Sequence, residues 1–169
     1  MELQEAKNKF IHSWGILGSS WGINKTMAQI HGLLLISSKP LSTEDIMEEL
    51  SISRGNANMN IRALIDWNIV LKDYQPGERK EFFVAEKDLW ETTIQVIIER
   101  RKRELEPLTK MIAQVKNLEV GSDDEQEVKE FNQMTKSIGK FAAKTDGMLN
   151  KLLKADKNWF FGSFLKLFK

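Results

Sequence analysis

The sequence predicts a mainly α-helical fold with one small β-hairpin, and three observations support this class. Apolar residues recur every three or four positions along most of the chain, which is the period of amphipathic helices. Residues 42–67 contain two short helical patterns separated by a tight polar turn. The pattern then changes to that of strands over residues 69–85, around a proline–glycine turn.

The first helix is predicted over residues 2–21. Its apolar stripe consists of Leu3, Ala6, Phe10, Trp14, Leu17 and Trp21. Gly15, Gly18 and Gly22 are expected to weaken this helix and mark its end. A long stripe with two tryptophans needs a partner surface, which is either the C-terminal helices of the same chain or a second subunit. Residues 1–22 are predicted to be a dimerisation helix.

The second helix is predicted to begin at a cap formed by Asn24 or Thr26 and to run to about Ile36. Most of its residues are apolar, so it is expected to be largely buried. His31 lies in this helix and is expected to be a packed or surface histidine, not a ligand. Pro40 follows and disfavours helical geometry in the residue before it.

Residues 42–67 are predicted to be the centre of the fold, as two helices and a turn. Ser42 can cap the first helix, with the carboxylate of Asp45 three positions on near the positive end of the helix dipole. Ser53 can cap the second, which runs from Arg54 to Asp66. This arrangement is typical of a helix-turn-helix.

The two faces of that second helix differ in chemistry. Its apolar stripe consists of Ala57, Ile61, Leu64 and Ile65. The opposite face carries Gly55, Asn56, Asn58, Met59 and Arg62. Small and amide side chains with arginines, and no long acidic side chains over three turns, suit a surface that approaches an anionic, hydrogen-bonding polymer.

Residues 69–74 and 81–85 are predicted to be the strands of a hairpin, because both are rich in β-forming residues. Arg79 and Lys80 lie at its tip. A helix-turn-helix followed by a hairpin is a winged helix, which would cover residues 23–88. The wing would bring two cations to the edge of the second helix, where a DNA backbone or minor groove would lie.

A long helix is predicted over residues 88–118, with a kink at Pro107. The locally basic stretch 99–104 is either a solvated helix face, which is favoured, or a contributor to DNA affinity.

A last helix is predicted over residues 123–154, with Ser122 and Glu125 as its capping box. Two long amphipathic helices exceed what one chain of this size can bury alone. Residues 89–157 are therefore predicted to serve dimerisation.

The end of the chain, residues 158–169, is an aromatic and basic tail. Docking of this tail onto the dimer helices is favoured. The alternative is a membrane-surface anchor, since Phe, Trp and Lys suit that interface.

Composition excludes several classes of function. The chain has 169 residues, no cysteine, two histidines and a net charge of +1. A thiol nucleophile is therefore impossible, a zinc site is not expected, and no cofactor is predicted. No segment reaches the roughly 18 apolar residues of a membrane span, and no signal peptide is recognisable, so a soluble cytoplasmic protein is expected. No phosphate-binding glycine loop or nucleophile motif is present, which argues against an enzyme.

The runs 53–64 and 76–83 resemble the MarR superfamily of winged-helix regulators, most closely its GbsR-like branch. The resemblance lies in a Ser-Arg-Gly start to the recognition helix and a Pro-Gly-Glu-Arg-Lys wing that ends in aromatic residues, and it extends over roughly residues 14–90. It implies a dimeric transcription factor, with a repressor as the favoured role. Carried over by position, the DNA-facing residues are Ser53, Arg54, Gly55, Asn56, Asn58, Met59 and Arg62, with Arg79 and Lys80 on the wing.

The leading functional prediction is a homodimer that binds a roughly palindromic double-stranded operator, with half-sites about one helical turn apart. Asn56, Asn58 and Arg62 are expected to contact base edges, where asparagine suits adenine and arginine suits guanine. The alternative is a winged helix used for protein–protein contact without specific DNA binding, which the near-neutral charge favours.

A sensor role is compatible with DNA binding. The resemblance implies a small-molecule effector, in some relatives a quaternary ammonium such as choline, and such cations bind in aromatic cages. The candidate cage residues are Trp14, Trp21, Trp67 and Trp90. Tryptophans at helical spacing are more often core residues, and this alternative stays open.

Overall fold

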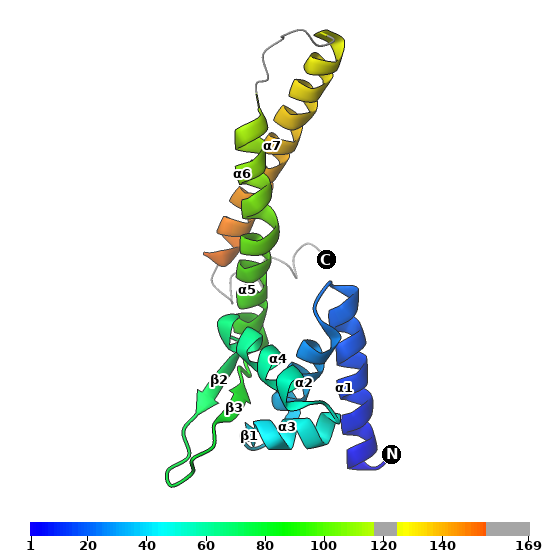
Figure 1. The fold of residues 1–169 in the computed structure, drawn as a ribbon, viewed down its shortest axis with the longest axis vertical. Helices are drawn as coiled ribbons and strands as arrows, with labels where there is room; N and C mark the ends of the chain where they lie inside the picture. Colours follow the sequence, from blue (N-terminus) through cyan, green and yellow to red (C-terminus); the bar gives the residue numbers. More distant parts are fainter. Residues whose placement is uncertain (117–124, 155–169) are drawn as a thin grey trace, which may run out of the picture. The chain divides into compact units, whose positions relative to one another are not determined.

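A computed structural model describes residues 1–116 and 125–154 of the chain. The chain divides into two compact units, Met1–Gln95 and Val96–Lys169. Figure 1 shows the elements of both units. The first unit contains α1 (Leu3–Ser20), α2 (Lys25–Ile36), β1 (Leu41–Ser42), α3 (Thr43–Leu50), α4 (Arg54–Asp66), β2 (Val70–Asp73) and β3 (Phe82–Ala85). Helix α5 (Leu89–Arg100) leads into the second unit, which contains the π-helical turn η1 (Arg101–Leu105), α6 (Glu106–Val115) and α7 (Glu125–Leu153).

The predicted fold class is confirmed: the protein is mainly helical, with a small antiparallel sheet beside a helix-turn-helix. The sheet has three strands in the order β1-β3-β2. The hairpin β2–β3 was predicted, but β1 was not, because two residues are too few to show a strand pattern. β1 pairs Leu41 with Phe83 of β3. This pairing ties the start of α3 to the wing.

The core of the first unit lies between α2, α3, α4 and β2. Its largest fully buried side chains are Ile30, Leu34, Ile46, Ile61, Leu64 and Val70. At about 1.5–3 kcal/mol for each large apolar side chain, this burial is the main force that fixes α4 against α2. The predicted stripe of α4 is confirmed, although Ile65 is only half-buried.

Predicted helix starts agree with the structure. Ser42 and Asp45 form a complete capping box at α3: the hydroxyl accepts from the Asp45 N–H at 3.3 Å, and the carboxylate accepts from the Ser42 N–H at 2.8 Å. Asn24, not Thr26, caps α2 by accepting from the N–H of Met27. Such caps are each worth about 1 kcal/mol.

The prediction that Gly15 and Gly18 help to end the first helix was wrong. α1 continues to Ser20, and both glycines are buried where α1 packs on α2. A Cβ on Gly18 would lie 2.4 Å from the Cβ of Ala28. The glycines therefore allow a close approach of two helices. Gly22, with φ +76°, follows the end of α1 as predicted.

The predicted apolar stripe of α1 is only partly used within this chain. Leu3 and Trp21 are 71% and 58% exposed, and Leu17 is also exposed. The buried positions of α1 are Ile11 and the two glycines, on the side that faces α2. Leu3, Leu17 and Trp21 therefore remain on the surface, whereas Phe10 and Trp14 are half-buried.

The second unit is built by packing of α6 and the η1 turn on α7. Ile112, Val128 and Ala142 are buried there, and a Cβ on Gly139 would lie 3.1 Å from Cγ2 of Ile112. The predicted irregularity near Pro107 takes the form of the π-helical turn just before it. Proline lacks the N–H of a helical hydrogen bond and its ring crowds the carbonyl four residues back, which widens the turn.

Two predictions cannot be compared with the described residues. Ser122 of the predicted capping box and the tail over residues 158–169 lie outside them. In the described part of the chain, none of the helices is both long enough and apolar enough to cross a membrane.

Candidate nucleic-acid interface

Helix α4, the second helix of the helix-turn-helix, presents a polar face that contains no acidic residue before Asp66. Ser53 caps it by accepting from the N–H of Asn56 at 3.3 Å. Gly55, Met59 and Arg62 are exposed, with Met59 at 61%. The predicted polar face therefore forms one continuous strip over the first three turns of α4.

Arg54 at the start of α4 is paired with a carboxylate of α3. Its guanidinium lies 2.8 Å from Oε1 of Glu44, and both side chains are largely exposed. The hydrogen bond from Arg54 is the main reason that the pKa of Glu44 lies below its usual value. An exposed pair of this kind is weak and is screened by salt, so phosphate can compete for Arg54.

Two asparagines of the polar face are held by neighbouring side chains. The NH₂ group of Asn60 donates to the backbone oxygen of Asn56 at 2.9 Å and to its Oδ1 at 2.7 Å. Asn58 Oδ1 lies 3.4 Å from the hydroxyl of Thr43 at the start of α3. Both asparagines are half-buried, whereas Asn60 is 3% exposed.

The wing carries Arg79 and Lys80 in the exposed loop between β2 and β3. Gly77 has φ +88°, which allows the turn, and Glu78 donates its N–H to the Gln75 carbonyl. Below the loop, Lys72 of β2 forms an ion pair with Glu81. In Figure 1 the wing extends beside β1 and α3. The strand pairing of β1 with β3 fixes this placement.

Electrostatic contacts link the wing to the start of α3. The pKa of Asp45 is lowered mainly by its hydrogen bonds with Ser42, with smaller contributions from Lys39 and Lys80. Lys80 likewise contributes, after Arg54, to the lowered pKa of Glu44. Arg54 and Lys80 therefore share Glu44 as a carboxylate neighbour, which lowers the net positive charge at this edge.

The structure brings the predicted DNA-facing residues together on two adjacent elements of one unit. Ser53, Arg54, Gly55, Asn56, Asn58, Met59 and Arg62 follow one another along α4, and Arg79 and Lys80 lie on the wing. Sequence reasoning missed Glu44, Thr43 and Asn60, which contact this face from the side or from below. Asn60 could have been found, because it lies four positions after Asn56 and on the stripe of Ala57 and Leu64.

The four tryptophans of the predicted cage lie on three helices. Trp14 in α1 stacks on Phe10 with ring centroids 5.4 Å apart, while Trp21 is the exposed C-cap of α1. Trp67 is buried at the end of α4, and Trp90 is half-buried in the first turn of α5. The contacts of Trp14 within the first unit are those of a packed residue, and the cage stays a prediction.

His31 belongs to the packing of α1 on α2, as expected from the sequence. Its Nδ1 accepts from Nε1 of Trp14 at 3.3 Å. Burial, with a smaller contribution from Lys87, lowers the pKa of His31 from 6.5 to about 4. His31 is therefore neutral at pH 7, which is the form that can accept this hydrogen bond.

Lys87 connects the end of the sheet to the end of α2. Its ammonium donates to the carbonyl oxygens of Leu34, Leu35 and Ser37 at 2.8, 2.7 and 3.1 Å. The last carbonyls of a helix have no partner within it, so this lysine satisfies the negative end of α2.

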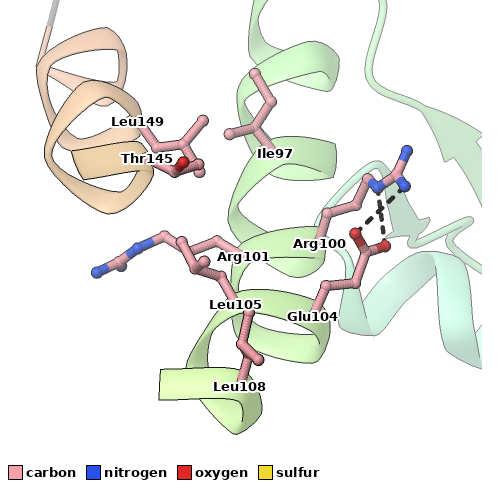
Figure 2. A pocket seen from close by; sticks show the side chains of 8 residues that line it. All are labelled: Ile97, Arg100, Arg101, Glu104, Leu105, Leu108, Thr145 and Leu149. Atoms are coloured by element: carbon pink, nitrogen blue, oxygen red, sulfur yellow. Dashed lines mark hydrogen bonds and ion pairs between the residues drawn. The ribbon is translucent and has the colours of Figure 1, made fainter. Parts of the chain in front are cut away.

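The second unit has a groove of about 360 Å³ between the η1 region and α7 (Figure 2). Its lining consists of Ile97, Arg100, Arg101, Glu104, Leu105, Leu108, Thr145 and Leu149. Arg100 is paired with Glu104, as Figure 2 shows, and Arg101 with Asp146 at 2.5 Å. Because both arginines are already paired and none of these lining residues is aromatic, this groove is not an aromatic cage for a cation.

No cluster of three or more metal-ligating side chains occurs within residues 1–116 and 125–154.

Three proteins of Bacillus subtilis (strain 168) are similar to this chain in sequence. The putative HTH-type transcriptional regulator YvaV is 22% identical over 136 residues, which cover 76% of this chain and 77% of that protein. The HTH-type transcriptional repressor OpcR is 27% identical over 44% of this chain and 40% of its own length. The HTH-type transcriptional repressor GbsR is 27% identical over 56% of this chain and 58% of its own length. The chain thus spans about half the length of these two repressors.

A solved structure described as the crystal structure of a transcriptional regulator has the same fold. It matches 89% of this chain and 99% of its own with a TM-score of 0.59, at 18% identity. No protein-family model matches the chain.

Proposed function

We propose that this protein is a DNA-binding transcriptional regulator that inserts α4 into a major groove and contacts the backbone with its wing. The observation that carries the proposal is the polar strip of α4, which offers amide and arginine side chains and a glycine, without an acidic residue before Asp66. Arg62 projects from this strip, and Arg79 and Lys80 extend it onto the wing. The names of the three similar proteins support the same class.

The names of two relatives, the HTH-type transcriptional repressors OpcR and GbsR, support a role as a repressor. The resemblance of the recognition helix and wing to the MarR superfamily agrees with this role. The proposal predicts increased transcription of the regulated gene when the protein is deleted.

We further propose that the protein acts as a homodimer. Apolar side chains of the helices remain on the surface of each unit. Leu3 and Trp21 in the first unit are 71% and 58% exposed, and Met134, Phe141 and Met148 in the second are 62%, 72% and 63% exposed. Exposed apolar surface of this kind marks association. A dimer would bind a roughly two-fold symmetric site. Light scattering coupled to gel filtration measures the mass in solution. A mass equal to that of one chain would exclude the dimer.

The test of DNA binding is a polarisation titration with the gene's own upstream duplex and a scrambled duplex of equal length. The proposal predicts tighter binding to the upstream duplex by at least about a thousandfold, the usual lower range of specific over non-specific binding. Arg79→Ala should weaken binding to both duplexes. It should also reduce the slope of log Kd against log salt by the amount that corresponds to about one phosphate contact. Lys136→Ala in α7, which removes an exposed lysine of the second unit, is the matched charge control.

The second candidate is a winged helix that contacts another protein. The observation in its favour is the net charge of +1, together with the pairing of Arg54 by Glu44. Equal affinity for the upstream and scrambled duplexes would favour this candidate.

A further inference from the structure

The amide of Asn60 lies under the polar face of α4 and uses its donors on a single neighbour. Asn60 is 3% exposed, so its polar atoms need partners within the protein. Its NH₂ group donates to the backbone oxygen of Asn56 at 2.9 Å and to the side-chain Oδ1 of Asn56 at 2.7 Å. An NH₂ group has two hydrogens, and these two bonds use both.

This pair of contacts fixes which way the Asn56 amide is turned. A side-chain amide can be rotated by half a turn, which exchanges its nitrogen and oxygen, and the surrounding hydrogen bonds decide between the two orientations. The backbone carbonyl of Asn56 can only accept, so Asn60 must turn its NH₂ group toward it. The same NH₂ group faces the Asn56 side chain, which must therefore present its oxygen.

The orientation of the Asn56 amide decides which of its polar groups faces outward from α4. Its carbonyl faces the buried Asn60, and its NH₂ group is the branch that is left toward the outside of α4. Asn56 is half-buried and belongs to the exposed strip, so this NH₂ group can reach a ligand that lies against α4.

We propose that Asn60 is a positioning residue that turns the NH₂ group of Asn56 toward DNA, so that this position reads hydrogen-bond acceptors on a base edge. The proposal rests on the proposed function, in which α4 lies in a major groove. The acceptors available there are N7 and O6 of guanine, O4 of thymine and N7 of adenine.

This reading differs from the pairing that asparagine usually makes. An asparagine that recognises adenine bidentately accepts from N6 and donates to N7, so it needs both branches of its amide at the base. Oδ1 of Asn56 accepts from the buried Asn60 and is therefore turned away from the outer side of α4. We therefore expect the amino groups of the bases to contribute nothing at this position.

Asn58 provides an internal comparison. Its Oδ1 lies 3.4 Å from the Thr43 hydroxyl, which is longer than the contacts of Asn60. A hydroxyl can donate or accept, so Thr43 does not fix the orientation of this amide. The restriction to acceptors should apply to Asn56 and not to Asn58.

The test uses a duplex that the wild-type protein selects from a random library. Asn56→Ala first identifies the base pair that Asn56 contacts, as the pair at which the variant loses its preference. Base analogues then delete one major-groove group of that pair at a time. Deletion of the acceptor should weaken wild-type binding by about fivefold, which corresponds to one hydrogen bond. Deletion of the amino group should change binding by less than about twofold, and Asn56→Ala should respond to neither.

The variant Asn60→Leu tests the positioning role. Leucine has a similar size and no donor, so it frees the Asn56 amide to rotate. In this variant, deletion of the amino group at the same base pair should begin to weaken binding, while preferences at the other pairs stay unchanged. A loss of affinity that is equal at every pair would show that Asn60 only supports the helix, and the proposal would be wrong. If this variant does not fold, the analogue series on the wild-type protein decides the question alone.

The outcomes distinguish failure of DNA binding from failure of the positioning role of Asn60. If the wild-type protein selects no sequence, both the proposed function and the positioning role of Asn60 are wrong. If it selects a sequence but loses affinity when the amino group at the Asn56 pair is deleted, the proposed function stands and the positioning role of Asn60 is wrong.

Discussion

Gly55 gives the sharpest prediction, because one methyl group should change stability and DNA binding in opposite directions. Gly55 is exposed in the first turn of α4, and a Cβ placed on it would meet no atom within 4 Å. Gly55→Ala therefore creates no clash within the protein. Alanine loses less backbone freedom on folding than glycine, so the free energy of unfolding should rise by about 0.5–1 kcal/mol.

DNA binding should respond in the other direction. In the proposed complex, the start of α4 approaches the duplex closely, and the added methyl group occupies that contact. Overpacking by a methyl group costs about 1–3 kcal/mol, so affinity should fall by about tenfold or more. Gly147→Ala in α7 is the matched control, since its Cβ also meets nothing within 4 Å.

Urea denaturation and polarisation titrations on the same preparations measure the two effects. Both alanine variants should be at least as stable as the wild type, and only Gly55→Ala should lose affinity. Wild-type affinity in a stable Gly55→Ala protein would refute the close approach of this turn to DNA.

Three further predictions concern packing, charge and pH. Gly18→Ala should lower the free energy of unfolding by about 1–3 kcal/mol, because its methyl group would overlap α2, and urea denaturation that shows no loss would contradict the helix contact. Glu44→Gln should tighten DNA binding by about twofold to tenfold and steepen its salt dependence, since it removes the carboxylate beside Arg54 and Lys80; unchanged titrations would mean that this carboxylate does not compete with phosphate. The lowered pKa of His31 means that the unfolded chain binds a proton between pH 6.5 and about 4 while the folded chain does not, so stability should fall by roughly 3 kcal/mol as pH decreases through this window. This loss should be smaller in His31→Phe and retained in His12→Gln, and equal pH profiles for all three proteins would exclude His31 as its source.

Local sequence signals predicted much of the fold. The caps of α2, α3 and α4 were recognisable because a capping side chain acts within three residues of the N–H groups that it satisfies. The two faces of α4 followed from helical periodicity. The hairpin followed from β-forming residues on both sides of Pro76 and Gly77.

The features that were missed depend on contacts distant in sequence. β1 is a strand only because β3 pairs with it. Gly18 appeared to be a helix-ending residue, and its role depends on Ala28 of the neighbouring helix. The partnership of Arg54 with Glu44 depends on how α3 crosses α4, which no local pattern encodes.

The sequence predicted which residues share the polar face of α4 and the wing loop, but not the hydrogen bonds among them. The polar side chains of α4 were visible at helical spacing, and the cations of the wing followed a recognisable turn. The orientation of Asn56 was not predictable, because asparagine can present either end of its amide. Its buried partner Asn60 removes that freedom.

The most direct test of the central claim is selection of duplexes from a random library by the wild-type protein and by Arg62→Ala. We predict that the wild type enriches a two-fold symmetric motif with half-sites about one helical turn apart, and that Arg62→Ala loses the preference at one pair in each half-site. No enrichment by the wild-type protein, or the same motif from both proteins, would contradict the assignment of α4 as the element that reads DNA.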